Sequence, residues 1–291
     1  MRWRDREQSR NVEDRRASSG RMSGGRGMPS LGTLLFLWPL IKPLFRSKAG
    51  IAIVGIGAAA YFFLPSFIGG GSSVTVDETR DQEQAAFIKT VMADTEKVWS
   101  DIFAQAGARY PAPILVLYRG GTQSGCGPAS SGMGPFYCPR DQKVYVDLSF
   151  FDDLERRHGA GGDFAQAYVL AHEIGHHIQN MQGTLTEIQR AKQRARGGRA
   201  NQLQVRVELQ ADCYAGIWAH HAQDKFNILE EGDLEEALNA AASIGDDRLQ
   251  KQAQGFAIPH TFTHGTSRQR AEWFARGFKR GVLEDCDTFS Q

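Results

Sequence analysis

The sequence has only four cysteines in 291 residues, and no two of them form the C-x-x-C pair of a zinc knuckle. The net charge is +1, so the overall balance points to no particular partner. Residues 190–199 are basic but have no interleaved aromatic residues for stacking on bases, which favours a solvated helix face. These absences exclude a separate zinc knuckle and argue against nucleic acid as a partner. With 41% hydrophobic residues, the chain can still bury a sizeable core.

The first 30 residues have no hydrophobic period. Residues 1–49 carry eleven lysines and arginines against four acidic residues. A segment with this composition cannot bury enough apolar surface to order itself. The sequence therefore predicts a basic, disordered tail over residues 1–30.

Two apolar runs come after the tail. Residues 31–45 are short for a bilayer and are interrupted by Pro39, Lys42 and Pro43, so an interfacial position is favoured over a spanning one. Residues 50–68 contain no charge and match the thickness of a bilayer core. We expect residues 31–68 to be the membrane segment, with 50–68 as its main span. A cleaved signal peptide is the alternative, and it is disfavoured because no clear A-x-A cleavage site follows the apolar run.

The basic excess before the span predicts a single-pass protein of the cell (inner) membrane. Its N-terminus would be cytoplasmic, and the chain after the span would be periplasmic or extracellular. Residues 69–76 begin with G-G-G-S-S in their first positions, which is typical of a flexible linker. Residues 77–291 would form the exported domain.

That domain changes from strand patterns to helix patterns along its length. Gly, Ser and Pro at 120–135 predict a loop, and strands precede the helices, so we expect an α+β domain that is mostly helical with a small sheet. The patterns predict helices at 81–106, 149–157, 163–182, 184–195, 201–222, 233–254 and 267–280, and strands at 114–118, 135–138 and 143–148.

Residues 172–176 read H-E-I-G-H within the helix predicted at 163–182. His172 and His176 are four residues apart and share one helix face, where two neutral imidazoles can bind one zinc ion. Glu173 lies one step round the helix and can reach a water molecule at that zinc as a general base. His177 points elsewhere and is interpreted as a structural or surface residue and not as a ligand. The pattern favours a metalloprotease over a chance match.

Catalytic zinc usually has three protein ligands, so a third is needed. Gln179 and Gln182 stand where a metzincin has Gly and His, which excludes that class. A glutamate from a second helix is the other common solution, and Glu208 is the candidate, with Asp212 orienting a histidine. Asp212 itself and Glu187 are the alternatives.

Export would oxidise the cysteines. Cys126 with Cys138 is the most economical pairing because it closes the Gly-rich loop onto the following hairpin, and it leaves Cys213 with Cys286. Free buried thiols would suit a cytoplasmic domain instead.

Many motifs in one order carry a resemblance to a known family. The sequence resembles the bacterial neutral zinc metallopeptidases over nearly its whole length except about residues 27–75, although the apolar run at 31–45 departs from their single-anchor pattern. The motifs are R-N-V-E-D-R-R, Y-R-G, G-C-G, M-G-P-F-Y-C-P, V-Y-V-D-L-S-F-F-D-D, H-E-I-G-H-H, E-L-Q-A-D-C-Y-A-G, G-D-L-E-E-A-L-N-A-A, I-G-D-D-R-L-Q and F-T-H-G-T-S.

This resemblance implies a zincin-like fold with one Zn²⁺ per chain. The E-x-x-A-D element is similar to that of gluzincins of the membrane CAAX-protease type, which implies Glu208 as the third ligand. His264, in a segment similar to one that lies near the transition state in those proteins, is implied as a catalytic residue that stabilises the oxyanion.

The sequence therefore predicts a membrane-anchored zinc endopeptidase acting on protein or peptide substrates of the cell envelope. An extended substrate would pair with an edge strand, for which residues 143–148 are the first candidate. One alternative is a non-catalytic, membrane-tethered zinc-binding or quality-control protein. Another is a zinc amidase that acts on cell-wall peptides.

Overall fold

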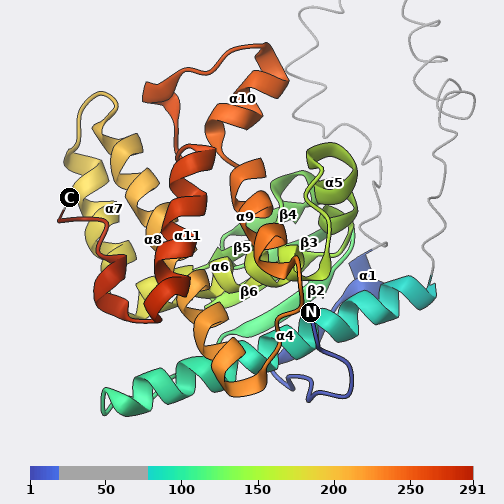
Figure 1. The fold of residues 1–291 in the computed structure, drawn as a ribbon. Coiled ribbons are helices and arrows are strands. Elements are labelled where there is room, and N and C mark those ends of the chain that lie inside the picture. The colour runs from blue at the N-terminus through green and yellow to red at the C-terminus, as the bar shows by residue number, and fades with distance from the viewer. Residues whose placement is uncertain (20–77, 291) are drawn as a thin grey trace, which may run out of the picture. The chain divides into compact units, whose positions relative to one another are not determined.

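The computed structural model describes residues 1–19 and 78–290, and residues 1–19 belong to the same compact unit as residues 79–290 (Figure 1). The described part is mostly helical with a small sheet, so the predicted α+β class is correct. The helices are α1 (Arg16–Ser19), α4 (Glu78–Gln105), α5 (Ser149–His158), α6 (Asp163–Met181), α7 (Thr184–Arg194), α8 (Arg199–Phe226), α9 (Asp233–Ser243), α10 (Asp246–Gln254) and α11 (Ser267–Arg280), with short 3-10 turns η2 (Ser131–Met133), η3 (Pro259–Thr261) and η4 (Leu283–Cys286). The strands are β1 (Val12–Asp14), β2 (Ile114–Tyr118), β3 (Gly121–Ser124), β4 (Gly127–Ser130), β5 (Phe136–Cys138) and β6 (Lys143–Asp147).

Four strands form one sheet in the order β1-β2-β6-β5. β1 and β6 run parallel to β2, whereas β5 runs antiparallel to β6. β2 and β6 read I-L-V-L-Y and K-V-Y-V-D, and all but the first residue of each is buried. Such apolar runs are typical of strands that are covered on both faces.

The edges of this sheet are β1 and β5. The expectation that residues 143–148 form an edge is wrong, because β6 is hydrogen-bonded to β2 on one side and to β5 on the other. The stretch 120–135, expected to be a loop, contains the antiparallel hairpin of β3 and β4.

The N-terminal segment is ordered over residues 1–19, so the prediction of a disordered tail is wrong there. β1 adds a strand to the sheet, and Met1 and Trp3 pack against the core. Arg6 Nη2 donates to the buried carboxylate of Asp94 at 2.5 Å. This segment is held by ion pairs and by the pairing of β1 with β2, and neither produces a hydrophobic period in the sequence. Residues 20–30 lie outside the described residues.

Helix α11 packs closely along α8. A Cβ on Gly277 would overlap the carbonyl oxygen of Cys213, and a Cβ on Gly216 would overlap that of Phe274. Each helix therefore has a glycine where the backbone of the other passes. This contact brings the first turn of α11 beside the middle of α8 (Figure 1).

Residues 233–254, expected to be one helix, form two. α9 ends at Ser243 and α10 begins at Asp246, with Gly245 between them. A Cβ on Gly245 would overlap the backbone of Ser267 at the start of α11. The break lets the chain pass close to α11.

The predicted membrane segment at residues 31–68 and the linker at 69–76 lie outside the described residues. Within residues 1–19 and 78–290, no helix has both the length and the apolar character needed to cross a bilayer.

The cysteines form the two bridges that the sequence favoured. Cys126 is bonded to Cys138, which ties the start of β4 to the end of β5. Cys213 on α8 is bonded to Cys286 in η4, near the C-terminus.

Candidate metal centre

Helix α6 directs His172, Glu173 and His176 toward one cavity. All three are on a helix whose remaining surface is largely buried, with Phe164, Leu170 and Ile174 in the core. Gly175 lies between the two histidines, and a Cβ there would meet the backbone of Ala211 at 2.9 Å. The glycine therefore lets α6 lie close against α8.

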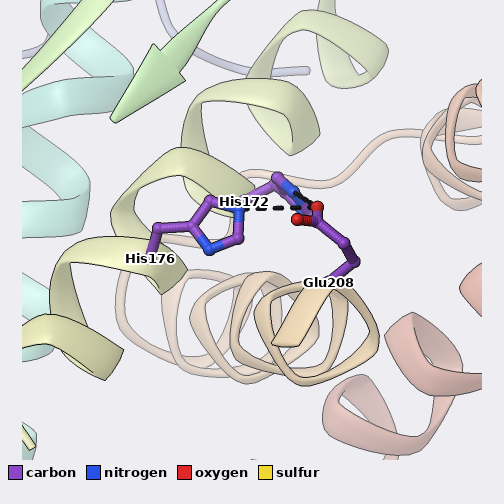
Figure 2. Close-up of side chains that lie close together, drawn as sticks. All are labelled: His172, His176 and Glu208. Carbon is purple, nitrogen blue, oxygen red and sulfur yellow. Dashed lines mark ion pairs between the residues drawn. The ribbon is translucent and has the colours of Figure 1, made fainter. Parts of the chain in front are cut away.

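Glu208 on α8 faces both histidines. Its Oε2 atom lies 3.3 Å from His172 Nε2 and 3.5 Å from His176 Nε2. Figure 2 shows the carboxylate and the two imidazoles converging from the two helices. One donor atom from each residue lies within 4.8 Å of the other two.

The opposite nitrogen of His172 is held by buried charges. Asp212 Oδ1 lies 2.8 Å from His172 Nδ1 and 2.5 Å from the hydroxyl of Tyr168. Arg270 on α11 contacts both carboxylate oxygens of Asp212, with Nε at 2.8 Å and Nη2 at 2.9 Å. Arg270 is 2% exposed and Asp212 is fully buried. Asp212 therefore has the orienting position expected of it, and Arg270 neutralises it.

Polar partners also hold His176 and Glu208 from behind. His176 Nδ1 lies 2.8 Å from the side-chain oxygen of Gln179, whose amide donates to the carbonyl of Val207 at 2.8 Å. Gln204 donates to Glu208 Oε1 at 2.7 Å, and Lys192 donates to Gln204 at 2.6 Å.

This pattern tests whether the residues suit zinc. Each of the three side chains has one polar atom bound by the protein, and the other turned toward the shared point. Two neutral imidazole nitrogens and one carboxylate oxygen form a common donor set of catalytic zinc, and partners behind the ligands are typical of such sites. The residues present therefore fit a zinc ion.

The charges of the site follow from its burial. Burial opposes the protonation of His172, but the carboxylates of Asp212 and Glu208 outweigh it and raise the pKa of His172 to about 9. Burial also opposes the ionisation of Glu208, but His176 and His172 hold its pKa well below its ordinary value. Glu208 is thus an anion facing two imidazoles, as a ligand to a cation should be.

Glu173 differs from Glu208 although both are buried. Burial raises the pKa of Glu173, while His176 and His172 act in the opposite direction. A backbone hydrogen bond from Tyr137 on β5 also reaches its carboxylate. A carboxylate with increased proton affinity beside a metal centre suits a general base.

The other predicted residues lie at different places. Glu187 is exposed on α7 and does not join the three ligand candidates. His177 is buried and points away, with Nδ1 3.0 Å from the hydroxyl of Tyr137 and Nε2 2.8 Å from the carbonyl of Pro111. His264 lines the cavity, is half exposed, and has Nδ1 3.2 Å from Asp246.

The cavity has a volume of about 940 Å³. Its walls include β5 and the residues before it, part of α7, and the start of α11. Apolar side chains such as Phe136, Phe150 and Ile188 line it, together with the basic Arg140 and Lys192. The candidate metal centre therefore opens into a concave site that combines apolar walls with polar and charged side chains.

Sequence reasoning missed Arg270, Gln204 and the roles of Gln179. No pattern in R-Q-R-A-E-W singles out Arg270. The sequence feature that could have indicated the contact between α8 and α11 is the pair of glycines, Gly216 and Gly277, because each lets the backbone of the other helix approach closely.

The chain matches the family described as "putative neutral zinc metallopeptidase" over residues 1–289. It is 47% identical over 294 residues to the uncharacterized protein YpfJ of Escherichia coli strain K12, which covers 100% of this chain and 99% of that protein. It is also 47% identical over 191 residues to the uncharacterized protein Rv2575 of Mycobacterium tuberculosis, covering 62% of this chain and 64% of that protein. No solved structure matches the chain significantly.

Proposed function

Since the chain belongs to the neutral zinc metallopeptidase family, we propose that it is a zinc-dependent endopeptidase with a zincin-like, gluzincin-type site that cleaves exported or envelope proteins. The observation that carries this proposal is the position of Glu173. It is buried in the cavity wall beside the convergent His172, His176 and Glu208. A purely structural zinc site has no use for a further, basic carboxylate beside its three ligands.

Zinc held by His172, His176 and Glu208 would supply Lewis acidity, polarising the scissile carbonyl and lowering the pKa of a water molecule toward ~7. Glu173 accepts the proton of the attacking water and later passes it to the leaving amine. His264 faces Asp246 through Nδ1, which donates its proton to the carboxylate, so Nε2 would stabilise the oxyanion as the second N–H of an imidazolium.

The substrate would lie extended along β5 instead of β6. β5 is a sheet edge, and Phe136 and Tyr137 line the cavity. An edge strand offers backbone groups to a peptide irrespective of its sequence, while the apolar walls select side chains. The disulfide at Cys138 holds one end of this strand.

An exported location is supported by the two disulfides, which persist in oxidising compartments. Attachment to the cell membrane is supported by the apolar sequence at residues 50–68.

The test is Glu173→Gln in the purified protein. The amide keeps the shape but cannot accept the proton, so we expect zinc to stay bound and hydrolysis of unfolded protein substrates to fall by at least about 100-fold. Glu187→Gln, which changes an exposed glutamate on α7, is the matched control and should retain full activity. Peptidoglycan fragments are assayed in parallel.

Three results would contradict the proposal. Equal hydrolysis by Glu173→Gln and the unchanged protein would exclude this residue as the base. Cleavage of peptidoglycan fragments alone would favour the amidase. Stoichiometric zinc with no hydrolysis of either substrate would favour the non-catalytic zinc protein.

A further inference from the structure

We infer that residues 1–19 and residues 78–290 lie on the same side of the membrane, so that the apolar sequence between them does not cross the bilayer just once. This inference rests on the membrane attachment proposed above, but it does not depend on the proposed endopeptidase activity. It differs from the single-pass arrangement expected from charge alone.

The first observation is the backbone pairing of β1. The amide of Leu115 donates to the carbonyl of Asn11 at 2.9 Å, and the amide of Arg15 donates to the carbonyl of Leu117 at 2.8 Å. Val12 is in register with Leu115. β1 thus covers the edge of β2, a buried strand in the middle of the domain, and cannot do so from across a membrane.

The second observation is the use of the basic side chains. Arg6 reaches Asp94 on α4, which is only 1% exposed. Arg16 pairs with Asp81 at the start of α4. The positive-inside rule counts basic residues that remain beside the membrane on the cytoplasmic side. These two arginines instead pair with carboxylates of the domain that the rule would place on the opposite side.

The third observation is apolar packing. The ring of Trp3 meets that of Phe87 on α4 edge to face, with centroids 5.3 Å apart. Met1 is 7% exposed and joins the main core. Backbone pairing, ion pairs and core packing therefore agree over the whole of residues 1–19.

The sequence between the two parts accommodates this arrangement. A chain that leaves and returns on one side crosses a bilayer an even number of times. Residues 31–45 and 50–68 provide two apolar runs, and Arg46 and Lys48 stand between them. An even number means either that both runs cross or that neither does, and it excludes a crossing by residues 50–68 alone.

Thiol labelling tests the inference in the full chain. All four native cysteines are in disulfides, so one added cysteine is the sole free thiol. Gln8→Cys and Gln252→Cys place it at exposed positions in the two parts. Sealed membrane vesicles are treated with a membrane-impermeant maleimide before and after detergent, and Gln8→Ser is the unreactive control.

We expect the two variants to label alike, either both before detergent or both only after it. Labelling of one before detergent and of the other only after it would overturn the inference. Recovery of the chain outside the membrane fraction would overturn it as well. If Gln8→Cys does not accumulate, Arg10→Cys, also exposed, is read in its place.

Discussion

Replacement of Arg270 by methionine is the change that should disturb the metal centre most without altering a ligand. The guanidinium binds both oxygens of Asp212, and both residues are buried. Methionine fills a similar volume but leaves the Asp212 charge without its partner, a loss that typically costs about 3–5 kcal/mol of folding free energy. Asp212 then holds His172 less firmly, and loss of such support weakens metal binding by about 10–100-fold.

Two measurements on the purified protein check this prediction: denaturant unfolding and zinc competition with a chelator. Arg270→Lys keeps the charge but loses the two-pronged contact, so it should fall between methionine and the native residue. Arg268→Met on the same helix is the matched control. The Arg268 side chain is 82% exposed and lies 3.5 Å from Glu272, so its loss should cost less than about 0.5 kcal/mol. Unchanged zinc affinity in Arg270→Met would refute the role given to this residue.

Three further predictions concern zinc, a bridge and pH. Glu208→Ala should lower zinc content far below one per chain in a metal assay after dialysis, whereas Asp212→Ala should keep zinc with about 10–100-fold weaker affinity; the reverse result would exchange their roles. Removing the Cys126–Cys138 bridge, which spans 12 residues, should cost about 3 kcal/mol in unfolding experiments but leave zinc content unchanged, and loss of zinc would contradict this. Burial raises the pKa of Asp94 from 3.8 to about 7, although Arg6 opposes this shift. The folded protein therefore keeps a proton on Asp94 that the unfolded chain has already lost. The stability that this proton gives is fully present below about pH 4 and is lost as the pH rises through 7. Asp94→Asn should therefore gain on the native protein between pH 5 and pH 8, by at most about 3 kcal/mol in denaturant unfolding, and an equal difference at both pH values would contradict the assignment.

The residues at the centre of the candidate site could be picked out from the sequence because they lie at helical spacing within single helices. His172 and His176 lie four residues apart, as do Glu208 and Asp212, so each pair shares a face wherever the helix packs. Which face of α8 meets α6 could not be read from spacing. It is set by Gly175, whose missing side chain lets the two helices touch.

Contacts between distant parts of the chain were beyond such reasoning. Arg270 and Asp212 are 58 residues apart, and nothing in either local sequence indicates the other. The order of the sheet was missed for the same reason, because β1 comes from residues that precede the predicted membrane segment. Residues 1–19 have the composition of a disordered tail. The ion pairs that order them cannot be recognised from this segment alone, because the partner residues lie far away in the sequence.

The strand proposed to hold a peptide and the helix that carries the base are joined twice. The backbone of Tyr137 donates to Glu173, and its hydroxyl lies 3.0 Å from both His177 and Asn180 on α6. The next residue, Cys138, is fixed by its disulfide. A displacement of β5 would therefore move the peptide and the base together, so their relative placement is kept. Because that placement decides proton transfer, loss of the contacts that join β5 to α6 should reduce kcat more than it changes KM.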